Sequence, residues 1–273
     1  MFLVLVFLGN LFVWPSVSTA EESRPQVRPA EWEVLPFGRP FPTLPTDPRD
    51  LKIGIRRNTL RQIEADIGGY RSLAGYTHNV RGETLALHIG VEGNAYFVLT
   101  QEGQKFPLNS SDGLLGIYGD AAWKDWQAQV RFTHLSAHLG DGVNPPRTRI
   151  PFSRETASLR IAKYFSFIRA YLGYHYLIHT EPLLPRHSLQ VGAFAIFPVT
   201  LGAHLHPYLG WDFEWRDPTQ GNLLTISLGL ALLSTEKSPP LRFALNYLKG
   251  NDPRGQFFQQ KIRYWTYGVE LDF

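Results

Sequence analysis

The sequence contains no cysteine in 273 residues. This absence excludes a disulfide framework, a zinc site with thiolate ligands, a cysteine nucleophile and a lipid anchor attached through cysteine. Charge of one sign is also scarce, because 27 Lys and Arg stand against 24 Asp and Glu, a formal net charge of +3. So small an excess, with carboxylates spread along the chain, argues against nucleic acid as a partner.

Long apolar runs are missing after the first twenty residues. The segment "MFLVLVFLGNLFVWPSVSTA" joins an apolar run to small residues, and Ser18 and Ala20 fit a small-x-small cleavage site. This pattern predicts a signal peptide over residues 1–20. No later segment has 18 uninterrupted apolar residues, so no transmembrane helix is expected. We therefore expect an exported protein that is not anchored by a helix.

Proline is concentrated between the predicted signal peptide and the rest of the chain. Residues 21–49 contain seven prolines. Because proline lacks an N–H and fixes φ, such a segment cannot join a central strand or a helix. The sequence therefore predicts a Pro-rich periplasmic arm over residues 21–49, before a domain that spans residues 50–273.

From about residue 51 apolar residues alternate with small or polar ones. The segments "ETLALHIGVEG", "LLTISLGLALL" and "LRFALNYL" each place a continuous apolar row on one face. Alternation that is broken by turn clusters predicts half-buried strands. The second face mixes Gly, Ala, Ser, Thr, Arg, His and carboxylates, which is typical of the wall of a narrow polar lumen. Repeats of about ten residues with tyrosine and tryptophan near the strand ends indicate an outer-membrane barrel.

The predicted fold class is all-β: a single antiparallel transmembrane β-barrel of about twelve strands in the bacterial outer membrane. The sheet must close, because an open edge would leave backbone groups unpaired in lipid. The even strand count puts both ends of the barrel domain at the periplasm. The last strand, "YWTYGVELDF", would place Phe273 on the lipid face, and it resembles the signal through which the barrel assembly machinery recognises such proteins. The expected strands are 51–57, 64–74, 83–98, 109–122, 126–137, 154–164, 167–179, 188–197, 203–215, 222–234, 241–249 and 262–273.

The segment "RFTHLSAHLGDG" carries the candidate active site. Alternation along the predicted strand 126–137 puts His134 and Ser136 on the lipid face, near the outer end of the strand. A polar pair facing hydrocarbon is costly and is a functional candidate for that reason. Glu155 on the next strand has the same phase, and residues opposite each other on neighbouring strands share a face. A hydroxyl, an imidazole and a carboxylate are the parts needed for serine-based acyl transfer.

Two other interpretations compete with catalysis. Polar side chains at this depth also form the rim at which a barrel meets lipid headgroups, and the segment also fits the start of a structured loop. A lone His-x-Ser pair is a weak motif. Catalysis is favoured by the coincidence of a shared face, a shared depth and an acidic residue in phase.

The segments "FPTLPTDPRD", "RFTHLSAHLGDG", "FSRE" and "PRGQFF" resemble a family of bacterial outer-membrane barrel proteins of unknown function. The His-x-Ser pair bears a more distant resemblance to outer-membrane phospholipase A, a twelve-stranded barrel, and to lipid A 3-O-deacylase. This resemblance implies that Ser136 is a nucleophile, His134 its base and Glu155 the acid that orients the base. It implies an acyl-ester hydrolase acting on outer-leaflet phospholipid or lipopolysaccharide. The alternative is a non-enzymatic barrel, either a narrow channel or a structural protein.

The loop that follows the His-x-Ser pair carries further polar candidates. Its arginines could hold lipid phosphates through bidentate contacts, and Asp141 could help to bind calcium. A solvated loop with a turn-forming aspartate explains the same residues equally well. Calcium is the single cofactor suggested, no metal-ligand set is predicted, and the sequence leaves a homodimer open. The candidate headgroup contacts are Asp141, Arg147, Arg149 and Arg154.

Histidines on the opposite face form a separate group. On strands 167–179 and 203–215 the alternation places four histidines toward the lumen. Pairs of histidines at i, i+2 on a strand can bind a metal. The same groups can instead join the lumen arginines in a hydrogen-bonded plug. These histidines are His175, His179, His204 and His206.

Overall fold

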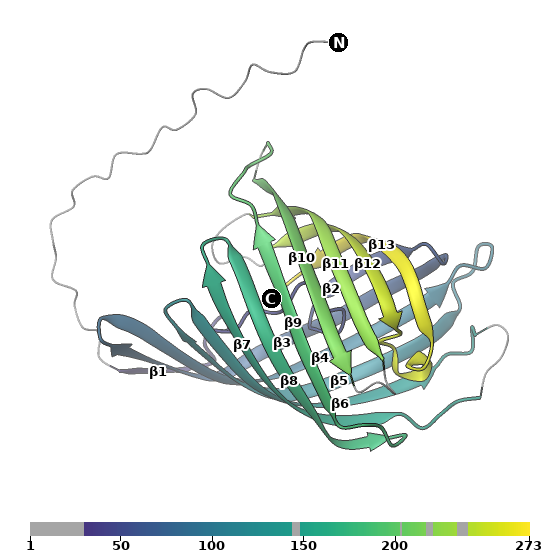
Figure 1. Cartoon of the computed structure of the whole chain (residues 1–273), viewed down its shortest axis with the longest axis horizontal. Helices are drawn as coiled ribbons and strands as arrows, with labels where there is room; N and C mark the ends of the chain where they lie inside the picture. Colours follow the sequence, from purple (N-terminus) through teal and green to yellow (C-terminus); the bar gives the residue numbers. More distant parts are fainter. Residues whose placement is uncertain (1–29, 144–147, 203, 217–220, 234–239) are drawn as a thin grey trace, which may run out of the picture.

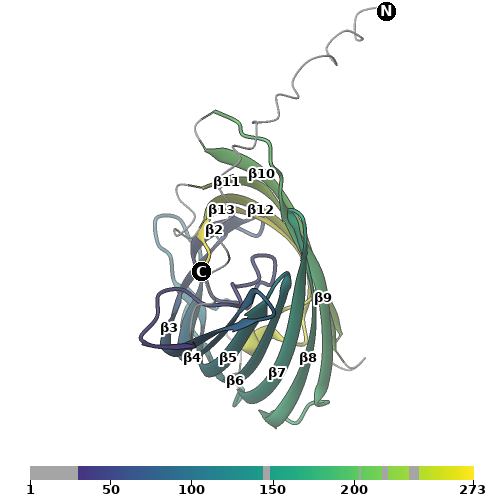
Figure 2. The ribbon, with the colours of Figure 1, turned by 90° about the vertical axis from the view of Figure 1, so that its left-hand side faces the viewer.

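The computed structural model describes residues 30–143, 148–202, 204–216, 221–233 and 240–273. Within these residues twelve strands form one closed antiparallel barrel, and a short strand β1 lies outside the ring (Figures 1 and 2). The strands of the first half are β1 Glu31–Val34, β2 Ile53–Asn58, β3 Gln62–Val80, β4 Glu83–Thr100, β5 Leu108–Trp123, β6 Trp126–Leu139 and β7 Ser153–Phe165. Those of the second half are β8 Ile168–Glu181, β9 His187–Ile196, β10 Leu205–Arg216, β11 Asn222–Leu232, β12 Leu241–Asn251 and β13 Lys261–Leu271.

Closure of the ring comes from the pairing of the last strand with the first barrel strand. Strand β13 pairs with β2, and β3 pairs with both β2 and β4, so each of the twelve barrel strands has two partners. In lipid this closure is required, because no water is present to satisfy a free strand edge. Strand β1 pairs only with residues 74–77 of β3. The predicted twelve-stranded barrel is confirmed, with β1 as an addition.

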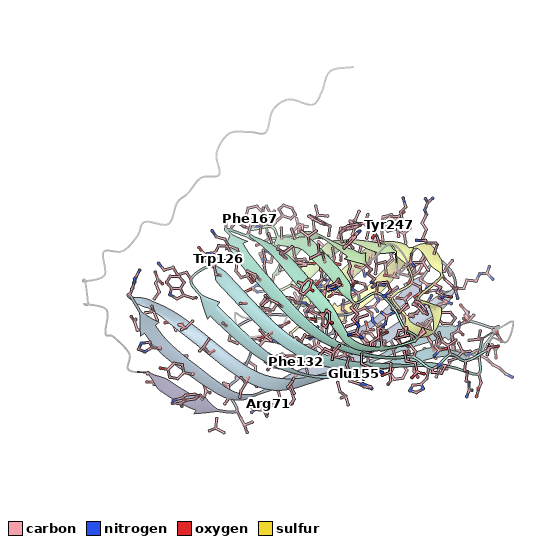
Figure 3. The ribbon with its side chains drawn as sticks, turned by 60° about the horizontal axis from the view of Figure 1, so that its bottom comes forward. Arg71, Trp126, Phe132, Glu155, Phe167 and Tyr247 are labelled. Carbon is pink, nitrogen blue, oxygen red and sulfur yellow. The ribbon has the colours of Figure 1, made fainter. Side chains whose placement is uncertain are left out.

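The two faces of the wall differ in chemistry as the alternation predicts. On β6, Val130 and Phe132 are exposed on the outside, whereas Gln129 and Arg131 are buried on the inside. Figure 3 shows Phe132 and Glu155 projecting from the outer surface. None of the helices within the described ranges is long and apolar enough to cross a membrane.

The connections distinguish the two ends of the barrel. Lys124 and Asp125 alone join β5 to β6, and two residues also join β7 to β8. Lys124 has φ of 54° and Ser166 has φ of 57°, the left-handed conformation that such tight turns need. The loops that follow β6 and β12 at the opposite end are long. The three two-residue turns, after β3, β5 and β7, all lie at one end and the two longest connections at the other, although the connections after β9 and β11 at the short-turn end span eight residues each.

Most of the Pro-rich segment that the structure describes lies inside the barrel. Residues 39–52 occupy the lumen, where Phe41, Leu44 and Leu51 are each only 1% exposed (Figure 2). Asp47 of this segment pairs with Arg160 on the inner wall at 3.0 Å. An extended proline-rich chain can lie here because side chains of the wall bind its backbone carbonyls, as Arg169 binds Thr43 and Arg242 binds Pro45, so it needs no strand partner. The predicted signal peptide and the start of the predicted arm, residues 1–29, fall outside the described ranges.

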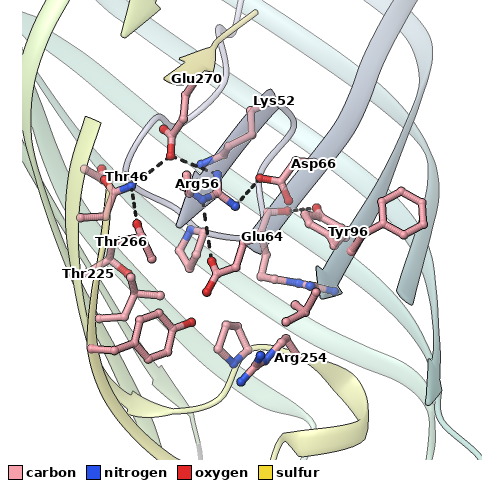
Figure 4. A pocket seen from close by; sticks show the side chains of 18 of the residues that line it. Thr46, Lys52, Arg56, Glu64, Asp66, Tyr96, Thr225, Arg254, Thr266 and Glu270 are labelled. Carbon is pink, nitrogen blue, oxygen red and sulfur yellow. Dashed lines mark hydrogen bonds and ion pairs between the residues drawn. The ribbon is translucent and has the colours of Figure 1, made fainter. Parts of the chain in front are cut away.

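Ion pairs and hydrogen bonds fill much of the remaining lumen. Arg56 lies between three carboxylates, at 3.8 Å from Glu64, 2.6 Å from Asp66 and 3.0 Å from Glu270 (Figure 4). A buried guanidinium requires such partners, because removing an unpaired charge from water is costly. Two lumen cavities of about 50 and 120 Å³ remain.

The chain terminus turns into the barrel. Strand β13 ends at Leu271, and the Phe273 ring packs against Tyr70 at 5.9 Å between ring centres. The Thr43 N–H of the lumen segment donates to the Phe273 carbonyl at 2.8 Å. The prediction that Phe273 faces lipid is therefore wrong, although Trp265 and Tyr267 do face outward. The reason is that the lumen segment provides a partner that the strand pattern alone does not show.

Candidate functional site

His134 and Glu155 lie directly opposite each other on β6 and β7. The His134 Nδ1 atom is 2.6 Å from Glu155 Oε1, and the two side chains are 50% and 35% exposed on the outer face. A carboxylate only accepts hydrogen bonds, so Nδ1 carries the proton and Nε2 has a free lone pair in the neutral ring. The pair therefore holds the imidazole in the tautomer that a general base requires.

His179 on β8 is a second histidine bound to the same carboxylate. It lies opposite Glu155, with Nδ1 at 2.5 Å from Oε2 and a side chain that is 63% exposed. The pairing shifts here, since Glu155 faces His179 whereas Thr156 faces Leu177, which leaves Ile178 as the extra residue of a β-bulge. Ile178 and His179 both face outward as a result.

The predicted lumen position of His179 is therefore wrong, because strict alternation does not anticipate the bulge. His175, which precedes the bulge, keeps the predicted orientation. Its Nδ1 atom lies 2.8 Å from Ser158 Oγ and its Nε2 atom 3.1 Å from Gln190 Oε1, both on the inner side of the wall. Within the sequence no residue type marks Ile178 as the bulge.

Two serines flank the histidine–glutamate pair. Ser136 and Ser153 lie opposite each other, one step toward the long-loop end. The Ser153 hydroxyl donates to Glu155 Oε1 at 3.2 Å. In the described part of the chain no hydrogen bond engages the Ser136 hydroxyl, so it is free to meet the unengaged Nε2 of His134, two residues away on the same face. The structure thus brings His134 and Glu155 into contact and places Ser136 beside them.

The loop after β12 fixes the strand ends that carry these residues. It contains the short 3-10 helix η1 Gly255–Phe257, part of the segment "PRGQFF". Gln256 Nε2 donates to the carbonyl oxygens of Ala137 and Ile150, each at 2.8 Å, and Gln256 Oε1 accepts from the Ile150 N–H at 3.2 Å. A Cβ on Gly255 would lie 2.4 Å from the Ala137 Cβ, so only glycine permits this approach. Sequence reasoning gave Gln256 no such role.

The predicted headgroup contacts do not gather at this site. Asp141 pairs with Arg149 at 2.9 Å, and both side chains are largely exposed. Arg154 lies on the inner face of the wall, 4.6 Å from the centre of the Phe152 ring, and so does not face lipid. Arg147 lies outside the described residues.

The histidines of β10 do not form a metal site either. His204 precedes the strand, and the nearest polar contact of the His206 ring is the Phe197 carbonyl, 3.2 Å from Nδ1. Across the ranges that the structure describes, no group of three His, Cys, Asp or Glu side chains is arranged to hold a metal ion.

Comparison with known families matches residues 26–273 to a family described as "Protein of unknown function (DUF1207)". The chain belongs to the DUF1207 family. The match covers the lumen segment and the entire barrel. A search among curated proteins gave no significant match.

Solved structures with a similar fold include outer-membrane phospholipases. This DUF1207 barrel superposes on the Salmonella typhi outer membrane phospholipase, a dimer with bound calcium, with a TM-score of 0.53 and 10% identity over 82% of this chain and 93% of that one. Outer membrane phospholipase A from Escherichia coli gives 0.51 and 11% identity, over 85% and 97% of the two chains. At such low identity the similarity establishes the fold, which is that of an outer-membrane barrel.

Proposed function

We propose that this barrel hydrolyses an acyl ester bond of an outer-leaflet lipid, either a phospholipid or the lipid A part of lipopolysaccharide. In this proposal Ser136 is the nucleophile, His134 the general base and Glu155 the residue that orients His134. The observation that carries the proposal is the 2.6 Å contact between His134 and Glu155 on the outer face, with a free serine hydroxyl two residues along. Polar side chains that face lipid are energetically costly, and catalysis on a lipid substrate explains why they are placed there.

The orientation in the membrane follows from the connections. Short turns lie at the periplasmic end of outer-membrane barrels and long loops at the outside. Strand β6 starts at the two-residue turn after β5 and ends at the long loop before β7, so it runs outward. His134 and Ser136 are near its outer end, at the depth of outer-leaflet ester groups.

The chemistry proceeds in two stages. Ser136 Oγ attacks the ester carbonyl carbon while His134 Nε2 takes the hydroxyl proton, and the Glu155 carboxylate stabilises the imidazolium through the Nδ1–H bond. The tetrahedral intermediate collapses when His134 returns this proton to the leaving alcohol, which leaves an acyl-serine. Water, deprotonated by His134, then attacks the acyl-serine. His134 returns the proton to Ser136 Oγ as the acyl–oxygen bond breaks, which releases the fatty acid and restores the free serine. Catalytic hydrogen bonds often tighten only when substrate binds, so the unengaged Ser136 hydroxyl fits a free enzyme.

Three donors hold the carboxylate in this outward site. Glu155 accepts from His134, His179 and Ser153. A carboxylate at a lipid-facing surface loses water contacts and is stabilised by such donors. We assign His179 and Ser153 the role of positioning residues that keep Glu155 aimed at His134.

Bound calcium and a dimer are features of the Salmonella structure, and the proposed mechanism uses neither. Asp141, the carboxylate considered for calcium, is already paired with Arg149. Among the described residues no further carboxylates gather around Asp141 to hold a metal ion, and no step above uses calcium. A channel would in turn require residues 39–52, which lie in the lumen, to leave it.

The decisive assay measures fatty-acid release by the refolded barrel in detergent micelles, on phospholipid and on lipopolysaccharide, with and without calcium. Ser136→Ala and His134→Ala are compared with the wild type, and Ser110→Ala, which alters a buried serine of β5, serves as the matched control. We expect release that both site variants abolish and the control retains. If no condition gives release, or if release survives both substitutions in folded protein, the assignment is wrong.

A further inference from the structure

A row of side chains crosses four strands on the wall formed by β10 to β13. Phe213, Leu224, Lys249 and Arg263 are successive partners across these strands. All four face outward, and they line a surface hollow of about 770 Å³ that Lys261 also lines. The hollow thus combines an apolar floor with three cationic groups.

The depth of this hollow is marked by an aromatic row beneath it. The row two residues toward the short-turn end consists of Trp211, Ile226, Tyr247 and Trp265. The Tyr247 and Trp265 rings lie 4.9 Å apart, and Figure 3 labels Tyr247 on this wall. Aromatic belts sit at the membrane interface, where one side of the ring meets apolar chains and the other meets headgroups. The cations therefore lie about 7 Å further out, at headgroup level.

The cations of the hollow lack acidic partners. Lys261 Nζ contacts the amide oxygen of Asn251 at 2.5 Å, and no ion pair within the described ranges involves Lys249 or Arg263. No carboxylate of the described residues lines the hollow. In contrast, a lumen arginine such as Arg160 contacts two carboxylates. The charge on this wall is thus available to an external anion.

We propose that Lys249, Lys261 and Arg263 form a binding site for the phosphate groups of a phosphorylated outer-leaflet lipid, whose acyl chains run from Phe213 and Leu224 down over the aromatic row beneath. Lysine and arginine near a membrane surface attract anionic headgroups, and arginine binds phosphate through two parallel N–H groups. In the ring, β12 lies five strands from β7 and six from β6. The site is therefore on the opposite wall from Ser136 and holds a different lipid molecule. The inference rests on the proposed membrane orientation, but not on catalysis.

The test titrates the refolded full-length barrel in neutral detergent with lipid A that carries both phosphates, and it counts bound lipid by native mass spectrometry. The variant is Lys249→Gln with Arg263→Gln. The matched control is Lys163→Gln, an outward lysine over the Trp126 ring at the short-turn end. Parallel titrations use dephosphorylated lipid A and inorganic pyrophosphate. A shift in gel mobility on heating verifies that each protein is folded.

We expect the double variant to bind lipid A roughly tenfold or more weakly, the control to bind as the wild type does, and dephosphorylated lipid A to bind weakly to all three. Equal binding of dephosphorylated lipid A to the wild type, or unchanged binding by the double variant, would overturn the proposal. Pyrophosphate binding without lipid A binding would also overturn it, because the site would then take free phosphate. Ser136→Ala should bind lipid A normally, so failure of the catalytic proposal is distinguishable from failure of this one.

Discussion

Glu155 and His179 lie opposite each other on β7 and β8, with His179 Nδ1 2.5 Å from Glu155 Oε2, because a bulge at Ile178 turns the histidine to the outer face. The other carboxylate oxygen contacts His134 at 2.6 Å. Glu155 on β7 therefore binds one imidazole from each neighbouring strand, His134 on β6 and His179 on β8. Bulges often redirect a side chain beside a functional site, and here the redirected residue holds the proposed orienting acid.

We predict that Glu155→Gln lowers kcat for ester hydrolysis on the order of a hundredfold or more, because an amide cannot stabilise the imidazolium of His134 as a carboxylate does. His179→Ala should cause a smaller loss, about tenfold, because Glu155 keeps its contact with His134 but loses one donor that holds it in place. Initial rates at saturating substrate measure both effects.

The combined variant separates positioning from direct catalysis. If His179 acts only through Glu155, adding His179→Ala to Glu155→Gln should lower kcat no further. A full additional tenfold loss in the combined variant would show that His179 contacts the substrate or the reacting atoms itself. His187→Ala, which alters an outward histidine at the start of β9, is the control.

Gln256 supplies a second test, this time of the loop that fixes the site. Its side chain makes three hydrogen bonds to the backbone of Ala137 and Ile150. Each hydrogen bond contributes about 1 kcal/mol, so Gln256→Ala should lower the melting temperature and reduce kcat several-fold as β6 and β7 separate at their outer ends. Gln259→Ala, at an exposed position in the same loop, should change neither. Equal behaviour of the two variants would remove Gln256 from the account.

The ionisation of Asp50 leads to a prediction of how the folding stability of the barrel depends on pH. Burial alone raises the pKa of this carboxyl, but Arg160, Arg131 and the Leu44 N–H together hold its pKa well below the usual range. The folded state therefore binds the proton more weakly than the unfolded state, in which the pKa is about 4. The stabilisation is present above that pH and is lost as the pH falls below it.

The wild-type melting temperature should thus fall as the pH is lowered from about 5 to about 2. Asp50→Asn should melt at a lower temperature near neutrality and show a shallower dependence on pH. Glu102→Gln, which changes an exposed carboxylate, is the comparison. If Asp50→Asn and the wild type lose stability in parallel on acidification, Asp50 does not anchor the lumen segment.

The barrel could be predicted from the sequence because lipid imposes a strict period of two on every strand. That period gave the faces of Phe132, His134 and Ser136 and the neighbouring position of Glu155. The period of two did not predict where a strand ends once its surroundings change from lipid. Strand β3 continues to Val80, past the predicted end at residue 74, because its last part pairs with β1 and β4 beyond the closed ring, where alternation is no longer required.

Contacts between distant segments were not predictable from local patterns. The lumen position of Thr43 and Asp47 depends on partners more than 100 residues away, such as Arg160 and Phe273. The bulge at Ile178 inserts one residue without a distinctive side chain. The role of Gln256 was not predictable either, because it depends on the close approach of Gly255 to Ala137 and not on the neighbours of Gln256 in the sequence.

The central claim is that Ser136 is a nucleophile activated by His134, and covalent labelling tests it most directly. The folded barrel is treated with a fluorophosphonate, and the modified residue is located by peptide mass spectrometry. The account predicts a single adduct on Ser136, lost in His134→Ala and retained in Ser153→Ala. Absence of labelling in folded wild-type protein, or an adduct on Ser153 in place of Ser136, would contradict it.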